Sequence, residues 1–217
     1  MLVDLNLQDK VVIVIGEGDE VETRVQQFLD AAAKVIVVDY RSNKNLKQLK
    51  SVKYVRWDRR CNFNELMEKY NPYALILATT NKQFASKISK AARTRHCPLV
   101  YAVDMPDLND FNMPAVAKLG DIRIAISTGG LSPAMASTLR KKIERIITTE
   151  DLQEVRLQAL MRDRIKDRIR NAELRKRCIY KIIHDDQIRK YLQDNKFEQA
   201  KKLAAKQIAL IANRGMS

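Results

Sequence analysis

Cysteine and histidine are both scarce in this chain of 217 residues. The three cysteines, Cys61, Cys97 and Cys178, lie far apart and outside any Cys-x-x-Cys spacing, so neither a disulfide framework nor a structural zinc site is expected. The two histidines, His96 and His184, leave little scope for histidine-based metal chemistry. We therefore expect three inert thiols in a reducing cytoplasm and no metal site.

Long apolar runs are also missing. The longest, such as residues 11–15, are far shorter than the ~20 residues needed to cross a bilayer. The N-terminus lacks the basic and then apolar order, and the small-residue cleavage site, of a signal peptide. The sequence therefore predicts neither a membrane-spanning nor a typically secreted protein, and no membrane partner.

Positive charge is in excess: 40 Lys and Arg against 26 Asp and Glu give a net charge of +14. Residues 151–217 contribute 17 basic and 9 acidic residues, so the excess is spread over the chain. Such a field favours polyanionic partners: nucleic acid, an anionic lipid surface, or a polycarboxylate or nucleotide ligand. The tail after residue 150 interleaves acids with bases and has only three aromatics, a poor platform for stacking bases. No nucleic-acid partner is therefore expected, although it remains an alternative.

Short apolar, β-branched runs recur through the first half of the chain. They are Val11–Ile15, Val35–Val38, Lys53–Trp57, Ala74–Ala78 and Leu99–Val103. Amphipathic stretches long enough for helices, such as 20–33 and 82–95, lie between most of them. Apolar strands that alternate with helices predict an α/β fold with a parallel sheet covered on both faces. A sixth run, Ile122–Ile126, follows Gly120-Asp121.

The second half of the chain predicts helices. Ser132-Pro133 offers a hydroxyl at the N-cap and a proline in the first turn, so a helix is expected from there to about Thr148. Residues 152–213 contain neither proline nor glycine, and leucine and isoleucine recur at helical spacing. We predict three helices there, with breaks near 184–186 and 194–196.

A dinucleotide-binding pattern follows the first strand. Gly16-Glu17-Gly18 lies directly after residues 11–15 and before a predicted helix. In this context the first glycine makes the tight turn and the second lets a pyrophosphate approach the backbone. Asp39 ends the second strand, where a carboxylate binds the ribose hydroxyls of NAD and repels the 2′-phosphate of NADP. The pattern therefore predicts NAD as the cofactor.

The same turn departs from the usual pattern in two ways. Val21 occupies the third glycine position, where it crowds the helix against the strand. The turn is also acidic, with Glu17, Asp19, Glu20 and Glu22, and these carboxylates would repel a pyrophosphate if they pointed at it. The alternative interpretation is a tight turn of an α/β fold that binds no nucleotide.

Polar residues follow three further strands. Thr79-Thr80-Asn81 comes after the fourth, so its side chains either contact the nicotinamide ribose or cap the next helix. Asp104 lies just past the fifth strand, as a base or as a turn residue. Ser127-Thr128-Gly129-Gly130 offers hydroxyls and backbone N–H groups suited to carboxylates, or is an ordinary loop before a helix.

These motifs together resemble the precorrin-2 dehydrogenase / sirohydrochlorin ferrochelatase family over residues 3–148. The residues that carry the resemblance are Ala78-Thr79, Val103-Asp104, Phe111-Asn112-Met113-Pro114-Ala115, the Ala-Ile-Ser-Thr-Gly-Gly-Leu-Ser-Pro-Ala run at 125–134, and Arg140 to Glu144. The run at 125–134 is long and specific, whereas the helical tail is similar only in type and length.

The resemblance implies a three-part protein. A Rossmann NAD-binding domain would span 1–112, a dimerisation segment 113–149 and a helical C-terminal domain 150–217, with the active site in the cleft between them. The family oxidises precorrin-2 to sirohydrochlorin with NAD, and some members also insert Fe²⁺ to give siroheme. A cytoplasmic homodimer acting in siroheme and modified tetrapyrrole (porphyrin-type) biosynthesis is thus expected.

The resemblance also assigns roles to residues of this chain. Asp104 falls on the essential aspartate and is the expected catalytic residue. The expected cofactor-binding residues are Gly16, Glu17, Gly18, Asp19, Glu20, Asp39, Tyr40, Arg41 and Thr79. The expected substrate-binding residues are Tyr101, Phe111, Pro114, Ser127, Thr128, Gly129 and Arg140, of which the arginine would grip substrate carboxylates.

This chain departs from the family at four positions. Glu17 replaces the middle glycine, Val21 a small residue, and Ala85 and Tyr101 replace asparagines. The departures leave two alternatives open: a relative with only chelatase activity, and a non-catalytic regulatory module that binds NAD or a tetrapyrrole.

Overall fold

The computed structural model describes residues 2–39, 46, 49, 51–57 and 62–214, with side chains up to residue 212. Tyr40 and Arg41, both expected to bind the cofactor, and Cys61 lie outside the described residues. The chain divides into two compact units, Met1–Met113 and Pro114–Ser217.

The first unit is an α/β domain. Its strands are β1 (Val11–Gly16), β2 (Lys34–Asp39), β3 (Val52–Arg56), β4 (Ala74–Ala78) and β5 (Leu99–Ala102). Its helices are α1 (Asp19–Asp30), α3 (Phe63–Tyr70), α4 (Lys82–Thr94) and the 3₁₀ turn η1 (Pro106–Leu108). All neighbouring strands pair in parallel in the order β3-β2-β1-β4-β5, which confirms the predicted fold class.

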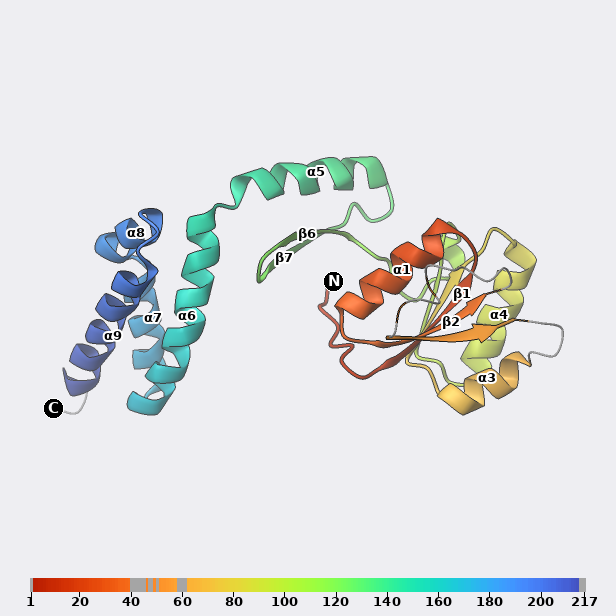
Figure 1. Cartoon of the computed structure of the whole chain (residues 1–217), viewed down its shortest axis with the longest axis horizontal. Helices are drawn as coiled ribbons and strands as arrows, with labels where there is room; N and C mark the ends of the chain where they lie inside the picture. The colour runs from red at the N-terminus through yellow and green to blue at the C-terminus, as the bar shows by residue number, and fades with distance from the viewer. Residues whose placement is uncertain (1, 40–45, 47–48, 50, 58–61, 215–217) are drawn as a thin grey trace. The chain divides into compact units, whose positions relative to one another are not determined.

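Alternate residues of the strands build a core on each face of the sheet. Ile13 and Ile15 of β1 pack with buried residues of α3 and α4, whereas Val12 and Val14 pack with those of α1. Figure 1 shows α1 on one side of the sheet and α3 and α4 on the other. Burial on both faces explains why β1, β2 and β4 are near-continuous apolar runs, whereas β3 at the edge of the sheet mixes apolar with basic residues.

The second unit begins with a hairpin and a helix. Strand β6 (Ala115–Leu119) pairs antiparallel with β7 (Ile122–Ile126), the predicted sixth run, in a sheet of their own. Helix α5 (Pro133–Ile146) begins as predicted, because the Ser132 hydroxyl accepts a hydrogen bond from the Met135 N–H at 3.2 Å. Strand β6 was not predicted.

Four further helices follow: α6 (Thr149–Arg168), α7 (Ala172–Ile183), α8 (Asp186–Gln193) and α9 (Phe197–Arg214). The breaks predicted near 184–186 and 194–196 are confirmed, but the prediction of three helices was wrong. The missed break has no proline or glycine. Ile169 is instead extended and buried, and the Asn171 side chain accepts from the Leu174 N–H to begin α7. Buried apolar residues of all four helices form one core.

Two described cysteines, Cys97 and Cys178, are buried and unpaired. Burial raises the pKa of each thiol, which keeps it in the unreactive protonated form. No group of three or more His, Cys, Asp or Glu side chains among the described residues is arranged to hold a metal ion. Within the same described residues, no helix is long and apolar enough to cross a bilayer.

Candidate functional site

The strand order of the first unit reverses at β1 and β4. Chain segments leave the carboxyl ends of these two neighbours toward opposite faces of the sheet, the position where α/β folds bind ligands. Gly16 and Ala78 are register partners at this edge, and the Glu17 N–H donates to the Ala78 carbonyl oxygen at 3.4 Å. The glycine turn and the residues after β4 are therefore neighbours in space.

The two glycines of the turn meet different constraints. A Cβ on Gly16 would lie 1.9 Å from the Ala78 carbonyl oxygen, so no side chain fits there. Gly18 has φ +83 and ψ −166, a conformation open essentially to glycine alone, and a Cβ there would meet nothing within 4 Å. Gly18 is the N-cap of α1 without a side-chain cap hydrogen bond. The first N–H groups of α1 are therefore available to an anion.

The acidic side chains of the turn do not all point toward the N-terminus of α1. The Glu20 carboxylate pairs with Arg24 at 2.5 Å, one turn further along α1, so its charge is drawn away from the helix N-terminus. Glu17 and Asp19 are exposed. Val21 is buried in the core between α1 and the sheet, where it contributes packing instead of the close helix contact of a glycine.

Arg24 joins Tyr101, a predicted substrate-binding residue, to the turn. Its guanidinium lies 5.4 Å from the centre of the Tyr101 ring, and it donates to the Met113 sulfur at 3.3 Å. The Tyr101 and Phe111 rings are 5.4 Å apart, so both aromatics pack on the α1 side of the sheet. Side-chain contacts thus run from Phe111 to Tyr101, from Tyr101 to Arg24, and from Arg24 to the Glu20 carboxylate.

Asp39, at the end of β2, is only 2% exposed. Its carboxylate accepts a hydrogen bond from the Tyr54 hydroxyl of β3 at 3.0 Å, and its carbonyl accepts from the Trp57 N–H at 2.9 Å. The side chain is therefore oriented by neighbouring strands at the carboxyl edge of the sheet.

The residues after β4 form a helix cap. The Asn81 side chain accepts from the Phe84 N–H at 3.0 Å, which makes it the N-cap of α4. The Thr79 hydroxyl accepts from the Asn81 N–H at 3.2 Å and keeps its own proton to donate. Asn81 thus fills the capping role, while the half-buried Thr79 retains a donor at the sheet edge.

Asp104 follows β5 in an unusual conformation. Its φ is +59, in the left-handed region that a non-glycine residue rarely adopts, and it is exposed. The preceding Val103 N–H donates to the Leu77 carbonyl at 2.9 Å, so β4 holds the chain up to this point. Strained residues persist where surrounding structure fixes them, and they cluster at functional sites.

The loop that carries Asp104 is fastened to β5, an edge strand. The Asp110 carboxylate accepts from the Val100 N–H at 2.8 Å and pairs with Arg93 of α4 at 2.9 Å. The Asn109 side chain accepts from the Ala102 N–H at 2.5 Å. The Asp110 and Asn109 side chains thus bond the N–H groups of β5 that a further strand would otherwise bond. Asp110 therefore has a structural role and is not a second acid of the site.

We expect Asp110→Ala to lower the free energy of unfolding by about 1–3 kcal/mol, because the Val100 N–H and the Arg93 guanidinium both lose a partner. Asp107→Ala, which removes an exposed carboxylate from the same loop, should change it by less than about 0.5 kcal/mol. Urea unfolding of both variants measures the difference, and equal effects would contradict the fastening role.

The other predicted substrate-binding residues belong to the second unit. The Ser127 hydroxyl accepts from the Gly129 N–H at 3.2 Å, and the Thr128 hydroxyl accepts from the Ser132 N–H at 3.1 Å. Both hydroxyls keep a proton to donate. Arg140 is paired with Glu144 one turn along α5, so a substrate carboxylate would have to compete for it. Pro114 is half-buried at the start of this unit.

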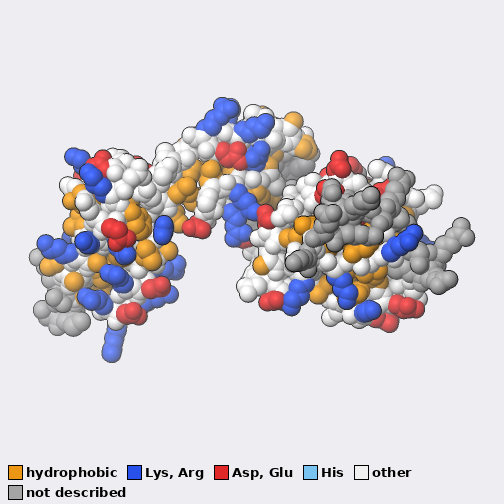
Figure 2. Space-filling view, viewed as in Figure 1, with side chains coloured by type: hydrophobic (Ala, Val, Ile, Leu, Met, Phe, Trp, Pro, Cys, Tyr) orange, Lys and Arg blue, Asp and Glu red, His pale blue; other side chains and the backbone are white. Residues whose placement is uncertain are grey.

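Basic side chains alternate with acidic ones on the helical surface of the described residues that can be seen in Figure 2. The charge pattern there resembles a solvated helical surface more than a track for a polymer backbone.

Sequence reasoning missed three contributors to the site: Arg24, Tyr54 and the pair Arg93–Asp110. The spacing of Glu20 and Arg24, four residues apart on a predicted helix, was a usable signal for their ion pair. No sequence signal joined Tyr54 to Asp39 or Arg93 to Asp110, because those contacts depend on strand order and loop path.

Two family profiles match the chain. The family described as "Putative NAD(P)-binding" matches residues 3–115, and the one described as "Sirohaem biosynthesis protein central" matches residues 120–146. The first covers more than half of the chain and contains the glycine turn, Asp39 and Asp104.

Curated relatives and a solved structure agree with these matches. The siroheme synthase of Psychromonas ingrahamii is 27% identical over 89% of this chain and 40% of its own length. That of Methylococcus capsulatus is 31% identical over 79% of this chain and 36% of its own length. The chain therefore spans about 40% or less of these relatives. A structure titled SirC, precorrin-2 dehydrogenase, is 20% identical with a TM-score of 0.74, over 95% of this chain and 99% of that one, which shows a shared fold.

Proposed function

We propose that this chain, which belongs to the family described as "Putative NAD(P)-binding", oxidises precorrin-2 to sirohydrochlorin with NAD, in keeping with the sirohaem biosynthesis match over residues 120–146 and with the siroheme synthases to which it is similar. One observation carries the proposal: the glycine turn, Thr79 and Asp104 follow the neighbouring strands β1, β4 and β5 at one edge of a parallel sheet. That edge would hold a dinucleotide beside a carboxylate. The family description agrees with the predicted cofactor.

The described residues fit the cofactor. The uncapped N-terminus of α1 and the open space at Gly18 suit the pyrophosphate, and the oriented carboxylate of Asp39 suits the ribose hydroxyls. Thr79 has a hydroxyl proton to donate toward the nicotinamide ribose. When bound, NAD accepts a hydride from a C–H bond of the substrate.

Asp104 is the proposed base. Loss of a hydride and a proton together makes the two-electron oxidation, so a proton must leave to a group at the sheet edge. The Asp104 carboxylate is exposed, and no described side chain donates a hydrogen bond to it, so it can accept that proton. The fastened loop and the left-handed backbone fix its position.

The deciding assay is anaerobic incubation of the purified chain with precorrin-2 and NAD, with NADH and sirohydrochlorin followed by absorbance. Formation of both in equal amounts supports the proposal. Absence of both from folded protein would exclude it and leave the alternatives of a chelatase-only relative or a regulatory module. Addition of Fe²⁺ to sirohydrochlorin tests iron insertion, in which the metal is a substrate. We place the reaction in the cytoplasm, in keeping with two unpaired, protonated thiols.

We expect NAD to be preferred over NADP, and Asp39→Asn to reduce the preference about tenfold or more. The substitution keeps the size of this buried side chain but removes the charge that repels a 2′-phosphate. Tyr54→Phe, which keeps the carboxylate and removes only its hydroxyl partner, should retain most of the preference. The ratio of kcat/KM for the two cofactors is the measurement, and an unchanged ratio in Asp39→Asn would contradict the assignment.

We also propose that segment 113–149 joins two copies of the chain. Large apolar side chains are exposed along it: Leu131 is 91% exposed, Ile146 69% and Met135 45%. Such a group of exposed apolar residues is typical of an interaction surface.

Leu131→Glu/Ile146→Glu should therefore give a monomer in sedimentation velocity at a concentration where the unchanged chain is a dimer. Leu160→Glu, at a 41% exposed position of α6, is the matched control and should stay dimeric. A monomeric unchanged chain would rule the dimer out.

A further inference from the structure

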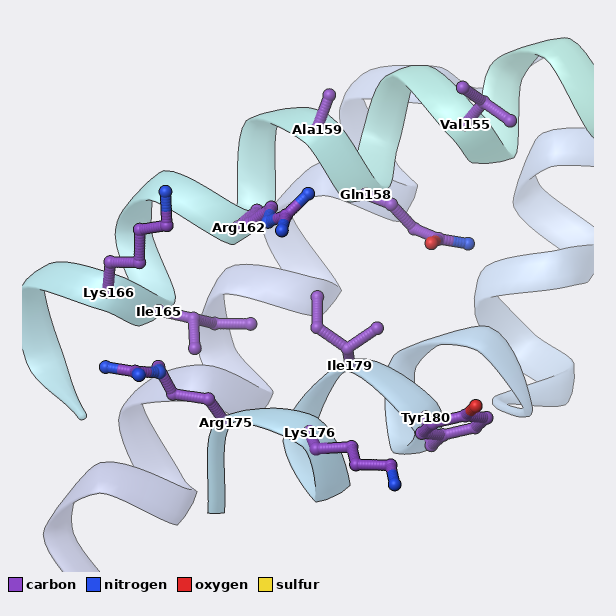
Figure 3. Close-up of a pocket in the computed structure, with 10 residues that line it drawn as sticks. All are labelled: Val155, Gln158, Ala159, Arg162, Ile165, Lys166, Arg175, Lys176, Ile179 and Tyr180. Carbon is purple, nitrogen blue, oxygen red and sulfur yellow. The ribbon is translucent and has the colours of Figure 1, made fainter. Parts of the chain in front are cut away.

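A groove opens between α6 and α7, within the second unit (Figure 3). Its volume of about 820 Å³ is in the range of sites for organic ligands. Figure 3 shows Gln158, Ile165 and Ile179 pointing into the space between the two helices. The groove lies entirely within one compact unit and contains none of the residues described above for the oxidation.

The floor of this α6–α7 groove is apolar. Ile165 is 2% exposed and belongs to the helical core, and Ile179 packs against that core. The walls add Ala159 and Val155, both exposed. Tyr180 is 53% exposed and offers an aromatic face at one end. Exposed apolar surface enclosed by two helices favours a ligand with an apolar body.

The rim is cationic. Arg162 and Lys166 come from α6, and Arg175 and Lys176 from α7. Arg175 donates to the carbonyls of Ile169 and Arg170 at 3.4 Å, which holds the turn between the helices. Among the described residues, no aspartate or glutamate lines the groove and none pairs with the other three cations. The rim therefore carries uncompensated positive charge above an apolar floor.

We propose that the α6–α7 groove binds a tetrapyrrole polycarboxylate, with its ring on the apolar floor and its carboxylates on the rim. Arg and Lys would bind the carboxylates by charge-assisted hydrogen bonds, and Tyr180 would stack on the ring. A phosphate polymer would use the rim but would leave the aliphatic floor unused. The groove itself indicates an organic polycarboxylate with an apolar body. The choice of a tetrapyrrole among such ligands rests on the proposed function.

The test uses uroporphyrin, a stable porphyrin polycarboxylate, titrated into the full chain without NAD and followed by porphyrin fluorescence. Arg162→Gln/Lys176→Gln removes two rim charges. Arg164→Gln/Arg177→Gln removes two charges from the same helices outside the groove and is the matched control. We expect the Kd to rise about tenfold or more in the rim variant and less than about twofold in the control. Equal effects would show general attraction to a basic protein and would overturn the site.

A second variant tests the shape of the groove. Ala159→Trp places a large side chain at an exposed wall position without changing the charge. The titration should then show one porphyrin site fewer per chain, while circular dichroism stays unchanged. Unaltered stoichiometry, or displacement of the porphyrin by inorganic phosphate or duplex DNA at equal concentration of negative charge, would overturn the proposal.

Failure of this inference can be told apart from failure of the proposed oxidation. Groove binding is measured without NAD, and it should persist in Asp104→Ala. A chain that binds uroporphyrin through the rim but makes no NADH would keep the groove and lose the oxidation. A chain that makes NADH but binds uroporphyrin alike in the rim and control variants would lose the groove alone.

Discussion

Asp104→Ala is expected to lower kcat for precorrin-2 oxidation by about 10²–10⁴-fold, the usual contribution of a positioned general base. The carboxylate is exposed at the end of β5, and it is held there by a left-handed backbone and by a loop fastened through Asp110. Hydride acceptance belongs to NAD, so the substitution should leave the Kd for NAD nearly unchanged. Single-turnover NADH formation and NAD titration measure the two quantities separately.

Two further variants separate charge from conformation. Asn tolerates the left-handed region about as well as Asp, so Asp104→Asn keeps the backbone and removes only the base. It should be nearly as slow as the alanine variant. Asp107→Asn removes an exposed carboxylate of the same loop and should retain most of the activity. Full activity of Asp104→Asn would show that position 104 matters for its backbone and would refute its role as base.

Regular local patterns made the first unit predictable. Short runs rich in apolar and β-branched residues predicted five parallel strands within about one residue of their observed bounds, and in β1, β2 and β4 these runs are continuous because both faces of the sheet are covered there. Ser132-Pro133 predicted the start of α5, because an N-cap hydroxyl and a first-turn proline are local signals.

Two features of the second unit were not predicted. Strand β6 is short and defined by its pairing with β7, and the break before α7 depends on Asn171 and on burial of Ile169.

The same division applies to the site. The location of Gly16, Asp39, Thr79 and Asp104 at one edge of the sheet could be predicted, because parallel strands carry their carboxyl ends to one edge. Nothing local indicated that Asp110 would bond the edge of β5, or that Arg24 would lie over the Tyr101 ring. Those contacts require the path of the loop and the position of α1 over the sheet.

Gly16→Ala is expected to destabilise the first unit by about 4 kcal/mol or more, the range reserved for a clash that backbone must absorb. The new Cβ would lie 1.9 Å from a carbonyl oxygen of β4, so β1 and β4 would have to separate at their carboxyl ends. Trp57, the single tryptophan of the chain, packs edge-on against Phe84 in this unit. Its fluorescence during urea unfolding therefore reports on the first unit in the whole chain.

Gly18→Ala is the matched control, because it adds the same methyl group two residues away in open space. It should destabilise by about 1–3 kcal/mol through its backbone conformation alone, and should weaken NAD binding because a side chain then stands where the pyrophosphate approaches. Ala78→Gly should not rescue Gly16→Ala, since the nearest atom is the carbonyl oxygen of residue 78 and not its side chain. Rescue by that substitution would mean that the side chain of residue 78, and not its carbonyl oxygen, excludes a Cβ at position 16. Equal losses at both glycines would mean that β1 and β4 can move apart. The tight turn would then be a feature of NAD binding and not of the sheet.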